Sequence, residues 1–323
     1  MPLGYLFGGG VGTEPHGTEL YEASPLVREL YEEISGWTGL TAEKILRGEL
    51  PEGRERRQSA GTIRETALAV AVHDLLAEAG LRPDVVGGLS LGAMTASCLA
   101  GALDRRSLFT LLARTADAPE PPPDAPEEGM ALAFVEAAEA QAPPPWHGVP
   151  DLYLAGDFGP LADGSRRILM LAGHRAAVER LAAEAAPGSV VPLPGRTIAV
   201  HSPLRRPFRD FITPHLATMP FTAPRIPLLS CLERGELKTA DEVRDMFERN
   251  STDPISLVDI YEGMRSHDVR LGLVMGPAIP EGMLDLPFPV VHVEKPEHIR
   301  LAVSTAYDLG IRLSPGDSAA RDR

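Results

Sequence analysis

A chain of 323 residues, of which 44% are hydrophobic and 24% charged, is long enough to bury the core of one large domain or two smaller ones. The formal charge of −14 argues against nucleic acid as a main partner, because phosphate binding needs a basic surface. The two cysteines predict neither a disulfide framework nor a metal cluster, and we see no signal peptide and no apolar run of roughly 20 residues. We therefore expect a cytoplasmic protein without a membrane partner.

The chain begins with a pattern of strand, glycine loop and helices. Tyr5–Phe7 is a short apolar run that breaks into the glycine-rich stretch Gly8–Gly12, which predicts a first strand entering a loop. A helix is expected around Pro25–Ile34. From Thr66 to Ala79 the apolar residues recur at helical spacing, which predicts a second helix.

Val85-Val86 then predicts a buried strand, and Leu91–Leu99 the next helix. Between them lies Gly88-Leu89-Ser90-Leu91-Gly92, which has the Gly-x-Ser-x-Gly form. The motif alone is also found in ordinary glycine loops, but the strand before it and the helix after it favour a nucleophile elbow. In that reading the amide of Leu91 points toward a developing oxyanion.

Asp117–Glu128 contains five prolines and predicts a boundary. The residues after it predict a strand, a loop, a second strand and a helix, which is typical of a small α+β subdomain, placed at 124–195. The elements of this subdomain are expected at Met130–Val135, around Pro143–Pro145, at Ile168–Leu171 and near His174–Ala186.

Beyond Pro194, apolar runs alternate again with expected helices, at Ile226–Leu229, Leu271–Met275 and Val290–Val293. The chain is therefore expected to return to the first sheet, which gives a discontinuous large domain from residues 1–123 and 196–313. Residues 314–323 are expected to form a flexible tail.

A serine nucleophile needs a general base, and His201 is the best candidate among nine histidines. It ends a short apolar run and precedes an expected helix, where α/β folds carry catalytic groups. His73 and His174 lie in or beside helical patterns and are interpreted as structural. The run Gly8–Gly12 fails the dinucleotide spacing because Thr13 takes the last position, so we expect either an oxyanion loop or a plain turn.

In order and spacing, these segments resemble the malonyl-CoA:acyl carrier protein transacylase family and the acyltransferase domains of polyketide synthases. The resemblance runs from about Leu6 to Ile311 and implies an α/β-hydrolase-like large domain with a parallel sheet and an inserted small ferredoxin-like subdomain. The segments that carry it are Leu6–Gly10, Thr62–Leu68, Gly88–Gly92, Ala100–Leu103, Leu171–His174, Val200–Leu204 and Met275–Pro277.

The resemblance implies ping-pong acyl transfer. Ser90 would attack a thioester, with His201 as general base and then general acid. The amides of Gly9 and Leu91 would form the oxyanion hole, and a backbone carbonyl near Asn250 would orient His201. No bound cofactor and no metal is implied. The phosphopantetheine arm would arrive on the substrate, either an acyl carrier protein or coenzyme A.

The departures from the family pattern concern the substrate. Members that use malonyl groups carry an arginine that pairs bidentately with the free carboxylate. Aligned without gaps, that position falls on Thr115, and Arg114 lies one residue earlier, about 100° away around a helix. The segment ending at Val200 matches neither usual extender-unit signature. The other departures are Gly9 for glutamine, Leu89 for histidine, Glu65 and Ala93.

We therefore expect a serine acyltransferase that moves a non-malonyl acyl group between donor and acceptor carrier proteins in polyketide or antibiotic biosynthesis. Discrete acyltransferases of macrolactam pathways, which move aminoacyl or dipeptidyl groups, resemble it most. The alternatives are a carrier-protein thioesterase of the same fold, a malonyl-CoA transacylase if a gap restores Arg114, and a non-catalytic scaffold.

Carrier proteins are acidic around the phosphopantetheine serine, so an enzyme that is itself acidic needs a local basic patch to bind them. The expected patch follows His201 in the sequence and consists of Arg205, Arg206 and Arg209, with Arg300 as a weaker candidate on the opposite rim.

Overall fold

Six strands form the central sheet of the large part of the molecule, in the order β11-β10-β1-β2-β7-β8. The computed structural model describes residues 1–10, 14–136, 146–277, 279 and 281–314. Within these ranges every neighbouring pair in the sheet is parallel except β7 and β8. The strands are β1 (Leu3–Phe7), β2 (Val85–Gly88), β7 (Leu228–Leu229), β8 (Glu236–Leu237), β10 (Leu271–Met275) and β11 (Val290–Val293).

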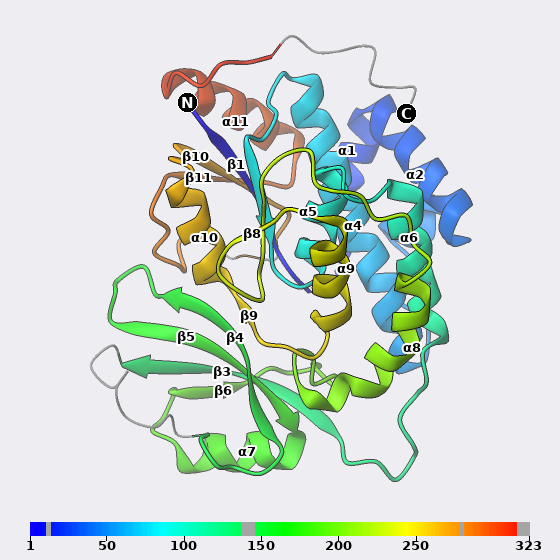
Figure 1. Cartoon of the computed structure of the whole chain (residues 1–323), viewed down its shortest axis with the longest axis vertical. Helices are drawn as coiled ribbons and strands as arrows, with labels where there is room; N and C mark the ends of the chain where they lie inside the picture. The colour runs from blue at the N-terminus through cyan, green and yellow to red at the C-terminus, as the bar shows by residue number, and fades with distance from the viewer. Residues whose placement is uncertain (11–13, 137–145, 278, 280, 315–323) are drawn as a thin grey trace.

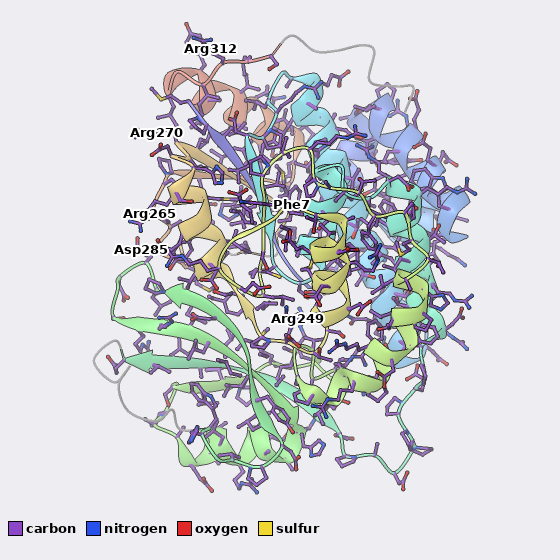
Figure 2. All side chains as sticks on the ribbon, in the orientation of Figure 1. Phe7, Arg249, Arg265, Arg270, Asp285 and Arg312 are labelled. Atoms are coloured by element: carbon purple, nitrogen blue, oxygen red, sulfur yellow. The ribbon has the colours of Figure 1, made fainter. Side chains whose placement is uncertain are left out.

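The central strands are covered on both faces. Every residue of β1 and of β10 is buried, as expected for a parallel sheet between two helical layers. In Figure 1, β1 runs from the N-terminus toward the middle of the molecule, with α4 and α5 on one side and α10 on the other. Phe7, at the end of β1, therefore lies in the interior, whereas Arg265, Arg270 and Arg312 lie at the periphery (Figure 2).

Most of the helices lie in two stretches of the sequence, residues 18–117 and 203–308. They are α1 (Thr18–Ala23), α2 (Pro25–Thr38), α3 (Ala42–Leu46), α4 (Arg54–Glu78), α5 (Leu91–Leu99), α6 (Arg105–Arg114), η1 (Thr115–Asp117), η3 (Pro203–Arg205), α8 (Arg206–Leu216), α9 (Ala240–Arg249), α10 (Leu257–Ser266) and α11 (Pro296–Asp308). No helix among the described residues is both long enough and apolar enough to span a membrane.

Helix α4 corrects one prediction, because it begins at Arg54 and not near Thr66. Its first half buries polar side chains, among them Glu55, Ser59 and Arg64. These residues interrupt the apolar period on which the prediction depended. The additional turns bring the N-terminus of α4 to the segment that carries His201.

A second sheet has the order β6-β3-β5-β4-β9, and it fills the lower part of Figure 1 together with α7. The first four strands pair antiparallel, and their order in the sheet is the one found in ferredoxin-like units. Strand β9 comes from the large part of the chain and pairs parallel with β4. The elements are β3 (Glu128–Glu136), β4 (Leu152–Pro160), β5 (Arg166–His174), α7 (Arg175–Glu184), β6 (Val190–Pro192) and β9 (Ile255–Ser256).

This arrangement confirms the expected fold class of a parallel α/β sheet with a small α+β unit. The prediction missed β4. The proline loop at 143–145 and the tail from 315 onward lie outside the described residues. The boundaries placed at 124 and 195 stay predictions.

Candidate active site

Ser90 lies on the sharp turn between β2 and α5, with φ 54° and ψ −116°. A non-glycine residue in this region of backbone space is strained, and such strain is concentrated at functional sites. The two glycines of the motif allow the turn to close. A β-carbon at Gly88 would overlap the carbonyl of Gly92, and one at Gly92 would overlap the carbonyl of Phe7. The Gly-x-Ser-x-Gly pattern is thus a steric requirement of this turn.

The structure brings Ser90 and His201 together across 111 residues of sequence, with Oγ 2.9 Å from Nε2. His201 also has a positive φ, 58°, and is 2% exposed. Its backbone amide donates to the carbonyl of Ser251 at 2.8 Å, which fixes the segment that precedes η3. Two strained residues from different elements therefore face each other at hydrogen-bonding distance.

Burial lowers the pKa of His201 to about 4, because the charged imidazolium would be poorly solvated. The backbone groups of Asp253 and Asn250 act in the opposite direction. Nδ1 forms no hydrogen bond of normal geometry with the described residues, although it is buried. The ring is therefore neutral at pH 7, which is the state that can accept the hydroxyl proton of Ser90.

Asn250 connects the two halves of this pair. Its Nδ2 donates to the carbonyl of Ser90 at 3.0 Å, and its backbone lies close enough to His201 to affect the pKa of the ring. The sequence had suggested a backbone partner near Asn250. Sequence reasoning missed Asp253 and the side-chain bond to Ser90, because nothing in the local pattern indicates either contact.

Gly9 and Leu91 lie on either side of the Ser90 turn. A β-carbon at Gly9 would lie 2.7 Å from the carbonyl oxygen of Leu89 and 3.0 Å from Cβ of Ser90, so the loop after β1 contacts the turn directly. Leu91 is the first residue of α5, where backbone amides lack partners within the helix. Their role as an oxyanion hole stays a prediction. Residues 11–13 of the glycine loop lie outside the described ranges.

Arg114 lies at the surface of the protein. Its side chain is 53% exposed, with Nε 3.4 Å from His215 and a terminal nitrogen 3.6 Å from Asp117. The next residue, Thr115, is buried, and its hydroxyl donates to the carbonyl of Leu112 at 2.6 Å. Neither side chain offers a cationic group to the interior.

The other predicted substrate residues lie beside the pair. Leu89 is buried, and its amide donates to the carbonyl of Phe7 at 2.9 Å, which ties the elbow to β1. Val200 directly precedes His201 and is half-buried.

The prediction that Arg205 belongs to the basic patch is wrong. Arg205 is 5% exposed and forms a bidentate ion pair with Glu55, so it is unavailable to a carrier protein. Three arginines in one helical stretch after His201 predict a surface patch, and the partner of Arg205, 150 residues away, leaves no signal in the sequence. Arg206 and Arg300 are exposed and Arg209 is half-buried.

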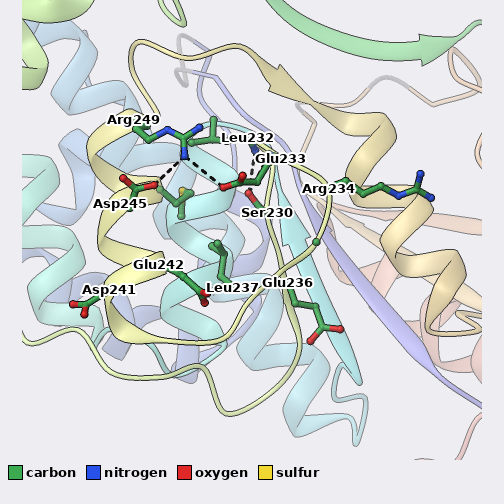
Figure 3. Close-up of a pocket in the computed structure, with 12 residues that line it drawn as sticks. Ser230, Leu232, Glu233, Arg234, Glu236, Leu237, Asp241, Glu242, Asp245 and Arg249 are labelled. Carbon is green, nitrogen blue, oxygen red and sulfur yellow. Dashed lines mark hydrogen bonds and ion pairs between the residues drawn. The ribbon is translucent and has the colours of Figure 1, made fainter.

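A separate groove of about 470 Å³ lies between the β7–β8 hairpin and α9, and neither Ser90 nor His201 lines it (Figure 3). Arg249 bridges Asp245 and Glu233 across it. The charged residues of its lining are mostly acidic: Glu233, Arg234, Glu236, Asp241, Glu242, Asp245 and Arg249. Such a lining repels an acidic partner. Among the described residues, no cluster of side chains has the composition of a metal site.

No family model matches the chain. It is 27% identical to the polyketide synthase GfsA of Streptomyces halstedii over 299 residues, which is 85% of this chain and 4% of that protein. It is 26% identical to the malonyl CoA-acyl carrier protein transacylase of Escherichia coli K12 over 214 residues, 62% of this chain and 64% of that one. The chain thus spans less than two thirds of either relative.

Solved structures with the same fold come from both groups. The transacylase of Helicobacter pylori superimposes with a TM-score of 0.79 at 18% identity, covering 95% of this chain and 99% of that one. The acyltransferase domain of the second module of the salinomycin polyketide synthase superimposes with a TM-score of 0.78 at 22% identity, and the match covers 97% of this chain and 74% of that one. A malonyl-transacylase of a type II polyketide synthase, solved with its acyl carrier protein, superimposes with a TM-score of 0.79 at 19% identity, and the match covers 94% of this chain and 100% of that one. The chain is therefore a homologue of the malonyl-CoA:acyl carrier protein transacylases and polyketide synthase acyltransferase domains, and it has their fold.

Proposed function

We propose that the chain is a serine acyltransferase that moves a non-malonyl acyl group, of the aminoacyl or dipeptidyl type, between acyl carrier proteins. The observation that carries the proposal is the 2.9 Å contact between Ser90 Oγ and a neutral, buried His201 on a strained strand-to-helix turn. Homology to transacylases and polyketide synthase acyltransferase domains supports it.

The chemistry follows from this pair. As Ser90 Oγ attacks the thioester carbonyl, Nε2 of His201 takes the hydroxyl proton, and the amides of Gly9 and Leu91 receive the oxyanion. The carbon–sulfur bond then breaks, and His201 returns the proton to the phosphopantetheine sulfur. The thiol of the acceptor carrier repeats the sequence in reverse and releases Ser90. The pantetheine arm belongs to the substrate, so no resident cofactor is required.

The absence of an inward-facing cation at the end of α6 supports a non-malonyl group. A malonyl carboxylate needs a bidentate arginine to replace its hydration. Here Arg114 is directed to solvent, and Thr115 uses its hydroxyl on the backbone of its own helix.

Glu65 supports the same conclusion with the opposite charge. Its Oε2 lies 4.0 Å from the point where Gly276 would carry a β-carbon, and Gly276 follows β10 at the sheet edge that also carries Gly9. Burial raises the pKa of Glu65, while the nearby charges of His16, Arg64 and Arg196 act in the opposite direction. No hydrogen bond or ion pair joins its carboxylate to the other described residues. An ammonium group would stabilise this carboxylate, whereas a second carboxylate would oppose it.

Intact-protein mass spectrometry tests the acyl group. After mixing with aminoacyl or dipeptidyl carrier protein, Ser90 should gain the corresponding mass, whereas malonyl-CoA should acylate it at least about tenfold more slowly, because the carboxylate lacks a partner. Thr115→Arg should increase malonylation. Efficient malonylation of the unchanged protein would contradict the assignment. An adduct that disappears without an acceptor would instead identify a hydrolase.

Carrier docking is expected at the start of α8, beside His201. Arg206→Glu or Arg209→Glu should raise KM for acylated carrier by about 3- to 10-fold, because an acidic carrier then meets a like charge. Turnover of a small thioester should stay unchanged. The matched control is Arg270→Glu, an exposed arginine before β10, at the opposite edge of the sheet. Equal losses with carrier and small thioester would assign the two arginines to the fold.

A further inference from the structure

A buried ion pair is formed by Arg205, which follows His201 closely in the sequence. Both terminal nitrogens of Arg205 donate to the Glu55 carboxylate, at 2.7 and 3.0 Å, and both side chains are at least 94% buried. The Arg205 guanidinium also lies 4.3 Å from the ring centre of Phe208. Arg205 ends η3, four residues after His201, whereas Glu55 belongs to the first turn of α4. The pair therefore fixes the chain on one side of His201 to the large domain.

A second pair fixes the other side. Arg54 donates to both carboxylate oxygens of Glu128, at 3.0 and 2.9 Å, and its Nε lies 3.4 Å from Glu55. Glu128 Oε2 in turn accepts the backbone amide of Ala199 at 2.6 Å. Ala199 precedes His201 by two residues and is completely buried. Glu128 begins β3, so this contact also joins the small sheet to the segment.

The four side chains form one network of alternating charge, Arg205–Glu55–Arg54–Glu128, which ends on the amide of Ala199. It holds the chain before and after His201 and connects α4, η3 and β3. Within the part of the chain that the structure describes, none of its members forms a hydrogen bond or an ion pair with Ser90 or with the imidazole, so the network acts through the backbone.

Such a network is not needed for stability alone. Burying ions is costly, and apolar side chains of similar size stabilise a protein at least as well. What bidentate pairs add is direction, because the fork geometry fixes both partners. His201 needs this constraint, since its φ of 58° is unfavourable for an L-residue without a surrounding structure that holds it.

We propose that the network Arg205–Glu55–Arg54–Glu128 positions His201 for proton transfer with Ser90, an inference that rests on the proposed acyltransferase function. Its residues are positioning residues, since they touch neither the substrate nor the reacting atoms. Loosening the network lengthens the time that Nε2 spends away from Oγ. The rate of acylation falls, while binding of the acyl group is unaffected.

The test uses the full chain and a fluorophosphonate probe, which requires no carrier protein. Ser90 Oγ forms a bond to phosphorus, fluoride leaves and His201 takes the hydroxyl proton. Glu55→Met combined with Arg205→Met replaces the central pair by apolar side chains and avoids an unpaired buried charge. We expect labelling to slow by about 10- to 100-fold at saturating probe, with half-saturation unchanged.

A matched control removes a similar pair elsewhere. Arg105 and Asp74 form a bidentate ion pair between α6 and α4, one of whose nitrogen–oxygen distances is 2.7 Å. Asp74→Leu combined with Arg105→Met should change the thermal stability no more than the Glu55→Met/Arg205→Met variant does and leave the labelling rate at the wild-type value. If the Glu55/Arg205 variant does not fold, Glu128→Gln serves instead, because it keeps the side-chain shape and removes the charge at the end of the network.

A His201→Ala background separates positioning from a general structural role. With the imidazole gone, removing the network should cause no further loss of labelling. Equal losses in the presence and absence of His201 would overturn the inference, as would wild-type labelling rates in both network variants. If the unchanged protein itself is not labelled at Ser90, the proposed function fails, and that result is distinct from the other two.

Discussion

Ser90→Ala is expected to abolish acyl-enzyme formation, with a loss of at least about 10³-fold in transfer rate, because no other group replaces the attacking hydroxyl. The fold should survive. The bond from Asn250 uses the Ser90 carbonyl, which alanine keeps, and alanine is no larger than serine on the strained turn. Intact-protein mass spectrometry with acylated carrier measures the adduct, and circular dichroism measures the fold.

The control for this variant is Ser97→Ala in α5, the helix that follows Ser90. Ser97 is buried, and its hydroxyl donates to the carbonyl of Ala93 at 2.8 Å, so alanine removes one helical side-chain bond at a cost of about 1 kcal/mol. Acylation should remain at the wild-type rate. A Ser90→Ala protein that still carried the acyl group to the acceptor at a normal rate would rule out the mechanism.

The strands that were predicted well are those with continuous apolar runs. The bounds of β10 and β11 match the prediction, and β1 begins two residues earlier than expected. Strands β1 and β10 are buried on both faces and need no alternation to be recognised, whereas β11 is an edge strand in which buried and half-buried residues alternate. Strand β4 was missed for the opposite reason. Its register shifts twice, between Leu154 and Gly156 and between Asp157 and Gly159, and the apolar positions lose their period.

The candidate pair Ser90 and His201 was predictable because each residue lies in a recognisable local motif whose order resembles a known family. The network around it was not. Glu55 and Arg205 are 150 residues apart, and each is an ordinary charged residue in a helical stretch. Charged side chains are normally exposed, so a pattern-based prediction assigns them to the surface unless the partner is known. Contacts of this kind follow from the tertiary arrangement alone.

His201→Ala should slow acylation of Ser90 by about 10³-fold, since an unassisted serine hydroxyl is a poor nucleophile at neutral pH. The fluorophosphonate rate measures this loss, and Ser90 remains present as the acceptor of the probe. A reduction smaller than about tenfold would exclude His201 as the general base.

The pH dependence of the unchanged protein tests the burial of His201. Its pKa of about 4 means that the ring is already neutral at pH 5, so labelling should be nearly flat from pH 5 to 8 and fall only as the pH approaches 4.

The free energy of unfolding should also fall as the pH is lowered. The folded pKa lies below the unfolded value of 6.5, so the unfolded chain takes up the proton first. The contribution of the neutral ring is present above pH 6.5 and is lost as the pH falls toward 4, by up to about 3 kcal/mol. His201→Ala should remove this part of the pH dependence. A labelling rate that halves near pH 6.5 would show that the imidazole is solvated, and the buried pair would then be the wrong description of the site.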